Sequence, residues 1–155
     1  ALHIPLIAVP TLEALAHHYI CEGVRLVPMM DAQKGNVYVQ EFAWETGVDG
    51  LTLREMHALS ILPLTEVIAA LTGTAQPALL LGDAMQKKNT IELPAHVRLA
   101  PIHARMPRAA CVGLAGLERL ARGDVDDPVA IQPLYLRRSE AEVLWEKRHG
   151  AEGAQ

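Results

Sequence analysis

The sequence predicts an α/β domain with a mixed sheet and flanking helices. Between residues 24 and 59, three stretches suited to strands are separated by short polar or glycine-containing turns. After residue 63, apolar stripes at helical spacing alternate with short apolar runs, which is typical of strands alternating with helices. The 155 residues have the length of one domain.

Composition narrows the class of protein. Half of the residues are hydrophobic and 21% are charged, as in an ordinary globular domain. The net charge of −4 argues against a broad nucleic-acid surface, which requires clustered lysine and arginine. Two cysteines, Cys21 and Cys111, are too few for a disulfide-rich secreted scaffold, so a reduced cytoplasmic protein is expected. The sequence has no apolar run of ~18 residues that could span a membrane.

The first segment is predicted to be a buried strand followed by a helix. The strand is the apolar run at 6–9, and Pro10 and Thr11 end it and can begin a helix. Gly23 is placed to end that helix. Its apolar stripe consists of Leu12, Leu15, Ala16, Tyr19 and Ile20.

A three-stranded meander and a helix are expected next. The strands are predicted at 24–30, 36–44 and 51–59, with turns at 31–35 and 46–50. Pro63 suits the first turn of the helix, Gly73 can end it, and the stripe between them is Leu64, Val67, Ile68 and Leu71. Three meander strands followed by a helix is how the repeated lobe of RNase H-like and actin-like folds begins.

The remaining chain is predicted to alternate strands and helices. Short buried strands are expected at 78–81 and 97–100, and a helix rich in small residues at 107–122. An extended segment is expected at 131–136. Ser139 and Glu142 have the spacing of a capping box, which predicts a last helix to about residue 150.

Asp31 and Asp83 are the best candidates for metal or nucleotide binding. Each follows an apolar run and is predicted to lie at a strand end, where α/β folds place ligands. A turn role is favoured, because aspartate side chains accept hydrogen bonds from nearby backbone N–H groups. No glycine-rich phosphate loop follows Asp31. The sequence therefore predicts no catalytic residue, no cofactor and no metal site.

Two groups of residues that contain histidines are candidate ligand sites. His17 and Cys21 are four residues apart on the predicted helix, but a structural zinc site needs four ligands, so polar-face positions are favoured for His17 and its neighbour His18. His103 with Arg105 and Arg108 could form an anion-binding corner at the start of the 107–122 helix.

No nucleophile has a catalytic motif around it. Ser60 lacks the Gly-x-Ser-x-Gly pattern, and Ser139 is explained by its capping box. Cys111 lies in the small-residue helix, where a buried, unreactive thiol is expected.

Three sequence strings resemble the TsaB (YeaZ) family. They are IAVPTLEALA at 7–16, PMMDAQKGNVY at 28–38 and PLYLRRSEAE at 133–142, and the resemblance covers roughly residues 3–148. Family members begin with a first lobe that carries a strand ending in Asp-Thr and a Gly-Pro-Gly-Ser-Phe-Thr-Gly-Leu-Arg type motif, and this sequence contains neither.

The resemblance implies a division of the chain. Residues 1–23 would close an N-terminal lobe that is missing here, 24–150 would form the C-terminal RNase H-like lobe of an actin-like (ASKHA) protein, and 151–155 would be a frayed tail. Loss of a lobe should uncover apolar surface on the 12–20 helix, which predicts self-association through that patch.

The resemblance also implies a function. TsaB is the non-catalytic subunit of the machinery that makes threonylcarbamoyladenosine in tRNA. The implied partners are a TsaD-type catalytic subunit, a TsaE-type ATPase and a second copy of the chain, with tRNA contacted only indirectly. In this family the contact with TsaD lies largely on first-lobe helices. Two alternatives stay open: a metal- or ATP-dependent enzyme of the glycoprotease or actin-like class, and a structural dimerisation module unrelated to tRNA.

Overall fold

A computed structural model describes the chain except residues 1–3, 49, 87–90, 135, 137–144 and 146–155. Five strands form one mixed sheet in the order β3-β2-β1-β4-β5. The strands are β1 (Arg25–Asp31), β2 (Asn36–Gly47), β3 (Gly50–Pro63), β4 (Ala78–Leu81) and β5 (Val97–Leu99). The helices are α1 (Thr11–Ala16), α2 (Leu64–Thr72), α3 (Ala109–Ala121) and the 3-10 turn η1 (Ile102–Ala104). The predicted α/β class with flanking helices is confirmed.

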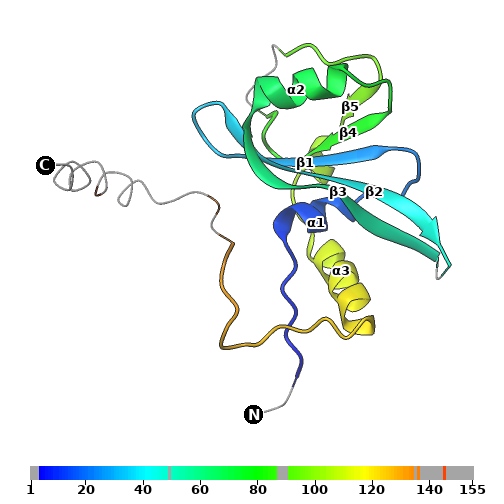
Figure 1. The fold of residues 1–155 in the computed structure, drawn as a ribbon, viewed down its shortest axis with the longest axis vertical. Helices are drawn as coiled ribbons and strands as arrows, with labels where there is room; N and C mark the ends of the chain where they lie inside the picture. The colour runs from blue at the N-terminus through cyan, green and yellow to red at the C-terminus, as the bar shows by residue number, and fades with distance from the viewer. Residues whose placement is uncertain (1–3, 49, 87–90, 135, 137–144, 146–155) are drawn as a thin grey trace, which may run out of the picture.

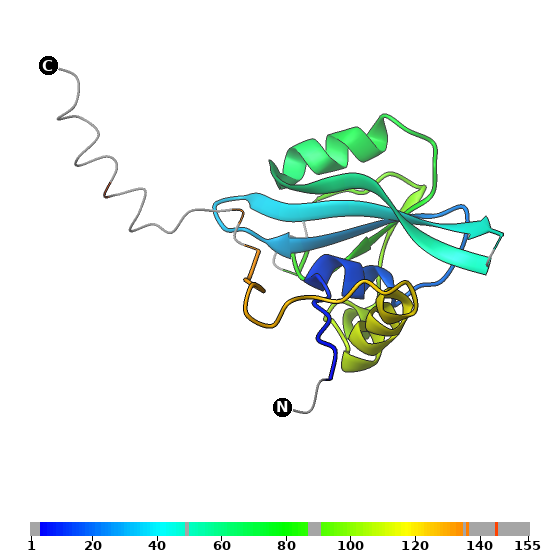
Figure 2. The same cartoon turned by 60° about the horizontal axis from the view of Figure 1, so that its bottom comes forward.

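The sheet lies between two helical layers. α2 covers one face, whereas α1 and α3 lie on the opposite face (Figures 1 and 2). Under α2, the core is built around Val27, Met29 and Leu80, and under α1 around Leu15, Leu26 and Phe42. Successive residues of β1 thus point into different cores, because side chains alternate across a strand. This explains why β1, in the middle of the sheet, is apolar throughout residues 26–30.

The sheet combines antiparallel and parallel pairing. β1, β2 and β3 form the predicted meander, with the β2–β3 ladder running from Gly47 opposite Gly50 to Asn36 opposite Pro63. Its register shifts between Val39 and Phe42, so extra β3 residues bulge out of the ladder there. β4 runs parallel to both β1 and β5. The carboxyl ends of β1 and β4 therefore meet at one edge of the sheet.

The first segment differs from the prediction. Residues 6–9 form no strand: within the described part of the chain, their one ladder-type contact is an isolated antiparallel bridge between Leu6 and Asp126. The backbone N–H of Ala8 donates to Asp126 Oδ2 at 2.6 Å, so this run is held by a loop. The helix ends at Ala16. After the N–H of His17, which still bonds four residues back, those of His18 and Tyr19 bond three residues back and tighten the chain into a turn.

Other boundaries shift by a few residues. β2 and β3 are longer than predicted, and Pro63 ends β3 and caps α2 instead of opening it. Residues 131–134 form no strand; the turn before them is closed by a bond from Ile131 N–H to the Asp127 carbonyl. The predicted helix over 139–150 lies outside the described residues apart from Trp145, as does the 151–155 tail. Among the described helices, none is long and apolar enough to cross a membrane.

Candidate functional site

The parallel pairing of β1 with β4 brings Asp31 and Asp83 together. Asp83 Oδ1 accepts a hydrogen bond from the backbone N–H of Asp31 at 3.1 Å. Asp31 Oδ1 accepts from the backbone N–H of Gln33 at 2.8 Å. Each carboxylate thus satisfies a backbone group at the start of a turn, which is the structural role that the sequence favoured for both.

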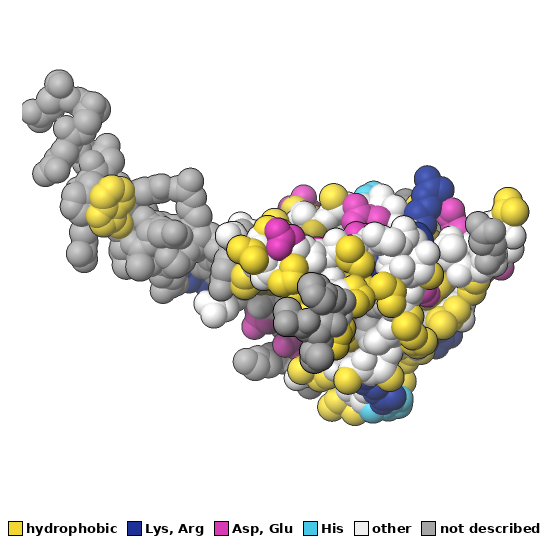
Figure 3. Space-filling model, turned by 90° about the horizontal axis from the view of Figure 1, so that it is seen from below, with side chains coloured by type: hydrophobic (Ala, Val, Ile, Leu, Met, Phe, Trp, Pro, Cys, Tyr) yellow, Lys and Arg dark blue, Asp and Glu magenta, His cyan; other side chains and the backbone are white. Residues whose placement is uncertain are grey.

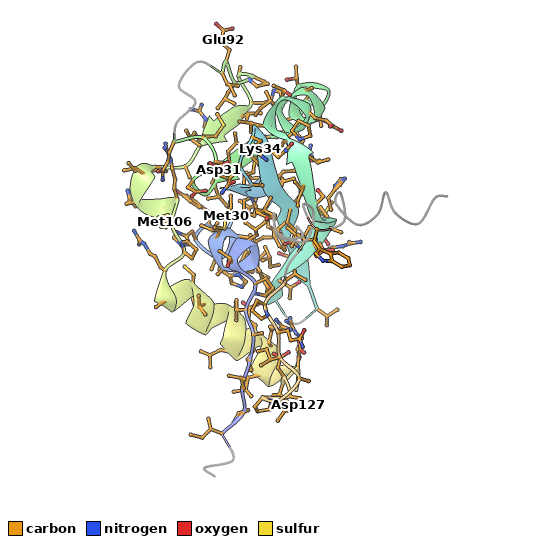
Figure 4. All side chains as sticks on the ribbon, turned by 90° about the vertical axis from the view of Figure 1, so that its left-hand side faces the viewer. Met30, Asp31, Lys34, Glu92, Met106 and Asp127 are labelled. Atoms are coloured by element: carbon orange, nitrogen blue, oxygen red, sulfur yellow. The ribbon has the colours of Figure 1, made fainter. Side chains whose placement is uncertain are left out.

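A cleft of about 300 Å³ opens between these aspartates and the tip of the β1–β2 hairpin. Lys34 also lines the cleft, and Figure 4 shows it close to Asp31. At the tip, Gln33 and Lys34 have positive φ angles of 65° and 53°, and Gly35 follows at 85°. Left-handed backbone at residues with side chains is costly and often marks a functional segment. The tip is thus the most strained backbone beside the cleft.

Among the described residues, the charged groups that line the cleft are two carboxylates and one ammonium group, and the amide side chains of Gln33 and Gln86 line it as well. No cluster of three or more His, Cys, Asp or Glu side chains that could hold a metal ion occurs among the described residues. Mg²⁺ can be held by one or two carboxylates when substrate phosphates and water complete its octahedron. Asp31 and Asp83 could supply that much.

Gly82 fixes the position of Asp83. Its φ angle is +90°, and a Cβ added there would lie 2.0 Å from the carbonyl oxygen of Met29 in β1. Only glycine allows this approach of the chain after β4 to β1. The cleft therefore depends on a backbone contact, which the sequence signalled only by the Gly82-Asp83 pair after an apolar run.

The structure does not support the zinc hypothesis for His17 and Cys21. Cys21 lies beyond the end of α1, so the two side chains do not share a helical face. His17 is 4% exposed, which contradicts its predicted place on a polar face. Its Nδ1 lies 2.9 Å from the Glu13 carbonyl and its Nε2 lies 3.5 Å from Glu118 Oε2. The ring also meets Trp44 edge-on at 5.4 Å. His17 joins α1 to α3 and the sheet.

The cations of the predicted anion-binding corner bond to their own loop. Arg105 Nε donates to the Ala100 carbonyl at 2.7 Å, and Arg108 Nη2 donates to the His103 carbonyl at 3.0 Å. These bonds stabilise the turn before α3. Nearby, burial lowers the pKa of His18, and the charges of Arg108 and His103 lower it further. These basic groups therefore disfavour a charged His18.

Cys111 behaves as the sequence predicted. It is 7% exposed on the buried side of α3, and burial raises the pKa of its thiol. A raised pKa keeps the thiol protonated and unreactive at neutral pH.

Comparison with known proteins identifies solved structures that share this fold. No family model and no curated protein matches the chain. Among solved structures, YeaZ from Pseudomonas aeruginosa aligns over 85% of the chain with a TM-score of 0.65 at 21% identity. The chain is similar in fold to YeaZ. A structure described as an uncharacterized protein with similarity to peptidase YEAZ, from the same organism, aligns over 86% with a TM-score of 0.64 at 23% identity.

This likeness confirms the resemblance to YeaZ at the level of the fold, which is a mixed sheet with flanking helices. The chain spans 59% of the length of each of the two YeaZ-type chains. At this level of identity, the comparison shows the architecture of the chain and nothing of its activity.

A second polar site, which the sequence analysis missed, lies on the α2 face of the sheet. A groove of about 260 Å³ is lined by Arg25, Glu41, His57 and Ser60 of the sheet and by Glu66 of α2. His57 Nδ1 lies 3.7 Å from Glu41 Oε2, but no hydrogen bond joins Ser60 to His57 in the part of the chain described, so no catalytic triad forms. The bulges in the β2–β3 ladder bring these residues together, and periodicity alone cannot reveal them.

Most of the predicted apolar patch over residues 12–20 is buried, although Ile20, beyond the end of α1, is 57% exposed. Leu12, Leu15 and Ala16 are at most 5% exposed because α1 packs against the sheet. Several large exposed apolar side chains lie on α3, and the face that carries this helix shows groups of hydrophobic side chains (Figure 3). The large exposed apolar side chains of α3 are Val112, Leu114, Leu117 and Leu120.

Proposed function

We propose that the protein is a non-catalytic adaptor subunit that supports threonylcarbamoyl transfer to tRNA adenosine through a TsaD-type partner. The observation that carries the proposal is the likeness in fold to YeaZ over 85% of the chain. The three TsaB-like strings in the sequence support it. The strand-end chemistry is consistent with it, because the two aspartates that would serve a nucleotide or metal accept bonds from turn N–H groups instead.

The partners of such an adaptor would be a TsaD-type catalytic subunit, a TsaE-type ATPase and a second copy of the chain. Indirect contact with tRNA fits the net charge of −4. The surface best suited to a protein partner is α3, where Leu117 is 63% exposed and Leu114 is 48% exposed. Contiguous exposed apolar side chains of this kind mark interaction surfaces. A cytoplasmic location belongs to the same proposal.

Size-exclusion chromatography with light scattering tests the adaptor role, using this chain and the TsaD-type protein of the same organism. We expect co-elution at a fixed stoichiometry. Leu117→Glu should abolish it, because a charge would enter an apolar contact. Val129→Glu is the matched control, since Val129 is 93% exposed and lies outside α3. Separate elution, together with no stimulation of threonylcarbamoyl transfer by this chain, would refute the proposal for this chain.

The main alternative is a metal- or ATP-dependent enzyme of the glycoprotease or actin-like class. The observation that favours it is the cleft with Asp31, Lys34 and Asp83 at the carboxyl edge of the sheet. An enzyme should bind Mg²⁺-ATP and lose activity in Asp31→Asn or Asp83→Asn, whereas an adaptor should stimulate its partner equally with and without these changes. A dimerisation module unrelated to tRNA would self-associate without binding the TsaD-type protein.

A further inference from the structure

The groove between α2 and the outer strands has a distinct polar composition. It is separate from the Asp31–Asp83 cleft, since none of the described residues lines both. Two carboxylates, Glu41 and Glu66, and one guanidinium, Arg25, line a space of about 260 Å³. Together these three groups carry one net negative charge, and His57, which also lines the groove, is positive only when protonated. This charge balance indicates what kind of ligand could enter.

The arginine of the groove is already paired with a carboxylate. Arg25 donates from Nε and Nη2 to Oε2 of Glu41 at 3.2 and 2.5 Å, and from Nη1 to the Thr74 hydroxyl at 3.2 Å. The two side chains of the ion pair are 11% and 13% exposed. Because they neutralise each other in a partly buried position, Arg25 is not available to attract an anion.

The acceptors of the groove are not all used. Both bonds from Arg25 end on the same oxygen of Glu41, Oε2, and no bond to Oε1 occurs among the described residues. The side chains of Glu66, in the first turn of α2, and of Ser60 also have no hydrogen-bond partner in the described part of the chain. A carboxylate is satisfied best by N–H donors that carry a positive charge. The groove therefore offers acceptors to a cation.

The walls between these polar groups are apolar. Val39 and Leu62 from the sheet and Val67 from α2 line the same space. An aliphatic chain can lie along such walls while its charged end reaches a carboxylate, as long basic side chains do on protein surfaces. The volume lies just below the range of ~300–1,000 Å³ typical of drug-sized ligands, so one short chain suits it.

We propose that this groove binds a short aliphatic chain ending in an ammonium or guanidinium group. The charged end would meet Glu66 and Oε1 of Glu41, and the methylene groups would lie on Val39, Leu62 and Val67. Such a group is found in free aliphatic amines and in lysine or arginine side chains of a peptide. The proposal does not depend on the adaptor role, because it uses no residue of α3 or of the cleft.

An NMR titration of the full chain at pH 8 tests it with three probes: agmatine, a capped Ala-Arg-Ala peptide and butanoate. We expect agmatine or the peptide to shift the amide resonances of Val39, Ser60 and Glu66, with butanoate leaving them unchanged. Shifts with agmatine alone would identify a free amine as the ligand class, and stronger binding of the peptide would identify a basic peptide.

A pair of glutamate variants tests whether the negative charge of Glu66 contributes to binding. Glu66→Gln should weaken binding about threefold to fivefold, the effect of losing one exposed ion pair. Glu92→Gln is the control, because Glu92 is also exposed but does not line the groove and projects from the end of the molecule (Figure 4). No shifts with either cationic probe, equal shifts with butanoate, or equal weakening by both variants would overturn the proposal.

Discussion

Replacing Gly82 with alanine should be among the most damaging single-methyl changes in this protein. The new Cβ would lie 2.0 Å from the Met29 carbonyl oxygen and 2.9 Å from its carbon, both backbone atoms that no rotamer change can move. The left-handed backbone alone costs an L-residue ~1–2 kcal/mol. Relieving the clash pushes β1 away from β4, and overpacking of this kind costs ~1–3 kcal/mol. We expect a loss of ~2–5 kcal/mol in the free energy of unfolding.

Thermal and urea unfolding measure this loss. At about 2–4 °C per kcal/mol for a chain of this size, the midpoint should fall by about 10 °C. The amide resonance of Asp31 should also move, because its bond to Asp83 depends on Gly82. Gly113→Ala is the matched control: its Cβ would meet nothing within 4 Å, so α3 should gain ~0.5–1 kcal/mol from the better helix former. A Gly82→Ala protein with wild-type stability and an unshifted Asp31 amide would refute the reasoning.

Three other substitutions test the ion pair and the titrating groups. Glu41→Gln should destabilise the protein by ~2–4 kcal/mol in urea unfolding, because it leaves the partly buried charge of Arg25 unpaired. The double variant Glu41→Leu with Arg25→Met should recover most of this loss, because no charge is then left in the partly buried position. Burial raises the pKa of Glu13, with Arg119 opposing, so its charged form costs stability above the folded pKa. Glu13→Gln should therefore stabilise the protein by less than ~1 kcal/mol at pH 7 and not at all well below the unfolded pKa of 4.5. Burial lowers the pKa of His18, so stability should be lost as the pH falls through the unfolded pKa of 6.5 toward the folded one, and His18→Phe should flatten this part of the curve of unfolding midpoint against pH.

Sequence periodicity predicted the elements whose neighbours are local. The meander strands and α2 follow one another along the chain, so their apolar patterns and turns define them almost completely. The run at 6–9 has an equally strand-like composition, but whether it pairs depends on Asp126, which is more than a hundred residues away. Short apolar runs fit a strand or an extended segment held by a loop, and only tertiary contacts distinguish the two.

The same difference between local and distant neighbours explains which candidate sites the sequence predicts. Asp31 and Asp83 were found because strand ends are visible in the sequence, and the parallel pairing of β1 with β4 then placed them together. His17 was misplaced because its burial depends on Trp44 and Glu118, which come from distant elements. The groove of Arg25 and Glu41 was missed because β-bulges set its register, and a bulge leaves no periodic signal.

The attachment of α3 to the rest of the protein determines how readily this helix unfolds locally. Of the described residues of α3, only Cys111 and Ala115 are buried. Two of the contacts that attach the helix to the rest of the protein are polar: Glu118 lies within reach of His17, and Arg119 donates to the carbonyl of Ala8. Segments with few buried apolar contacts exchange their amide hydrogens through local opening, at a fraction of the global free energy. The amides of α3 should therefore exchange well before those of β1, and the molecule would present its apolar helix as a separately opening unit.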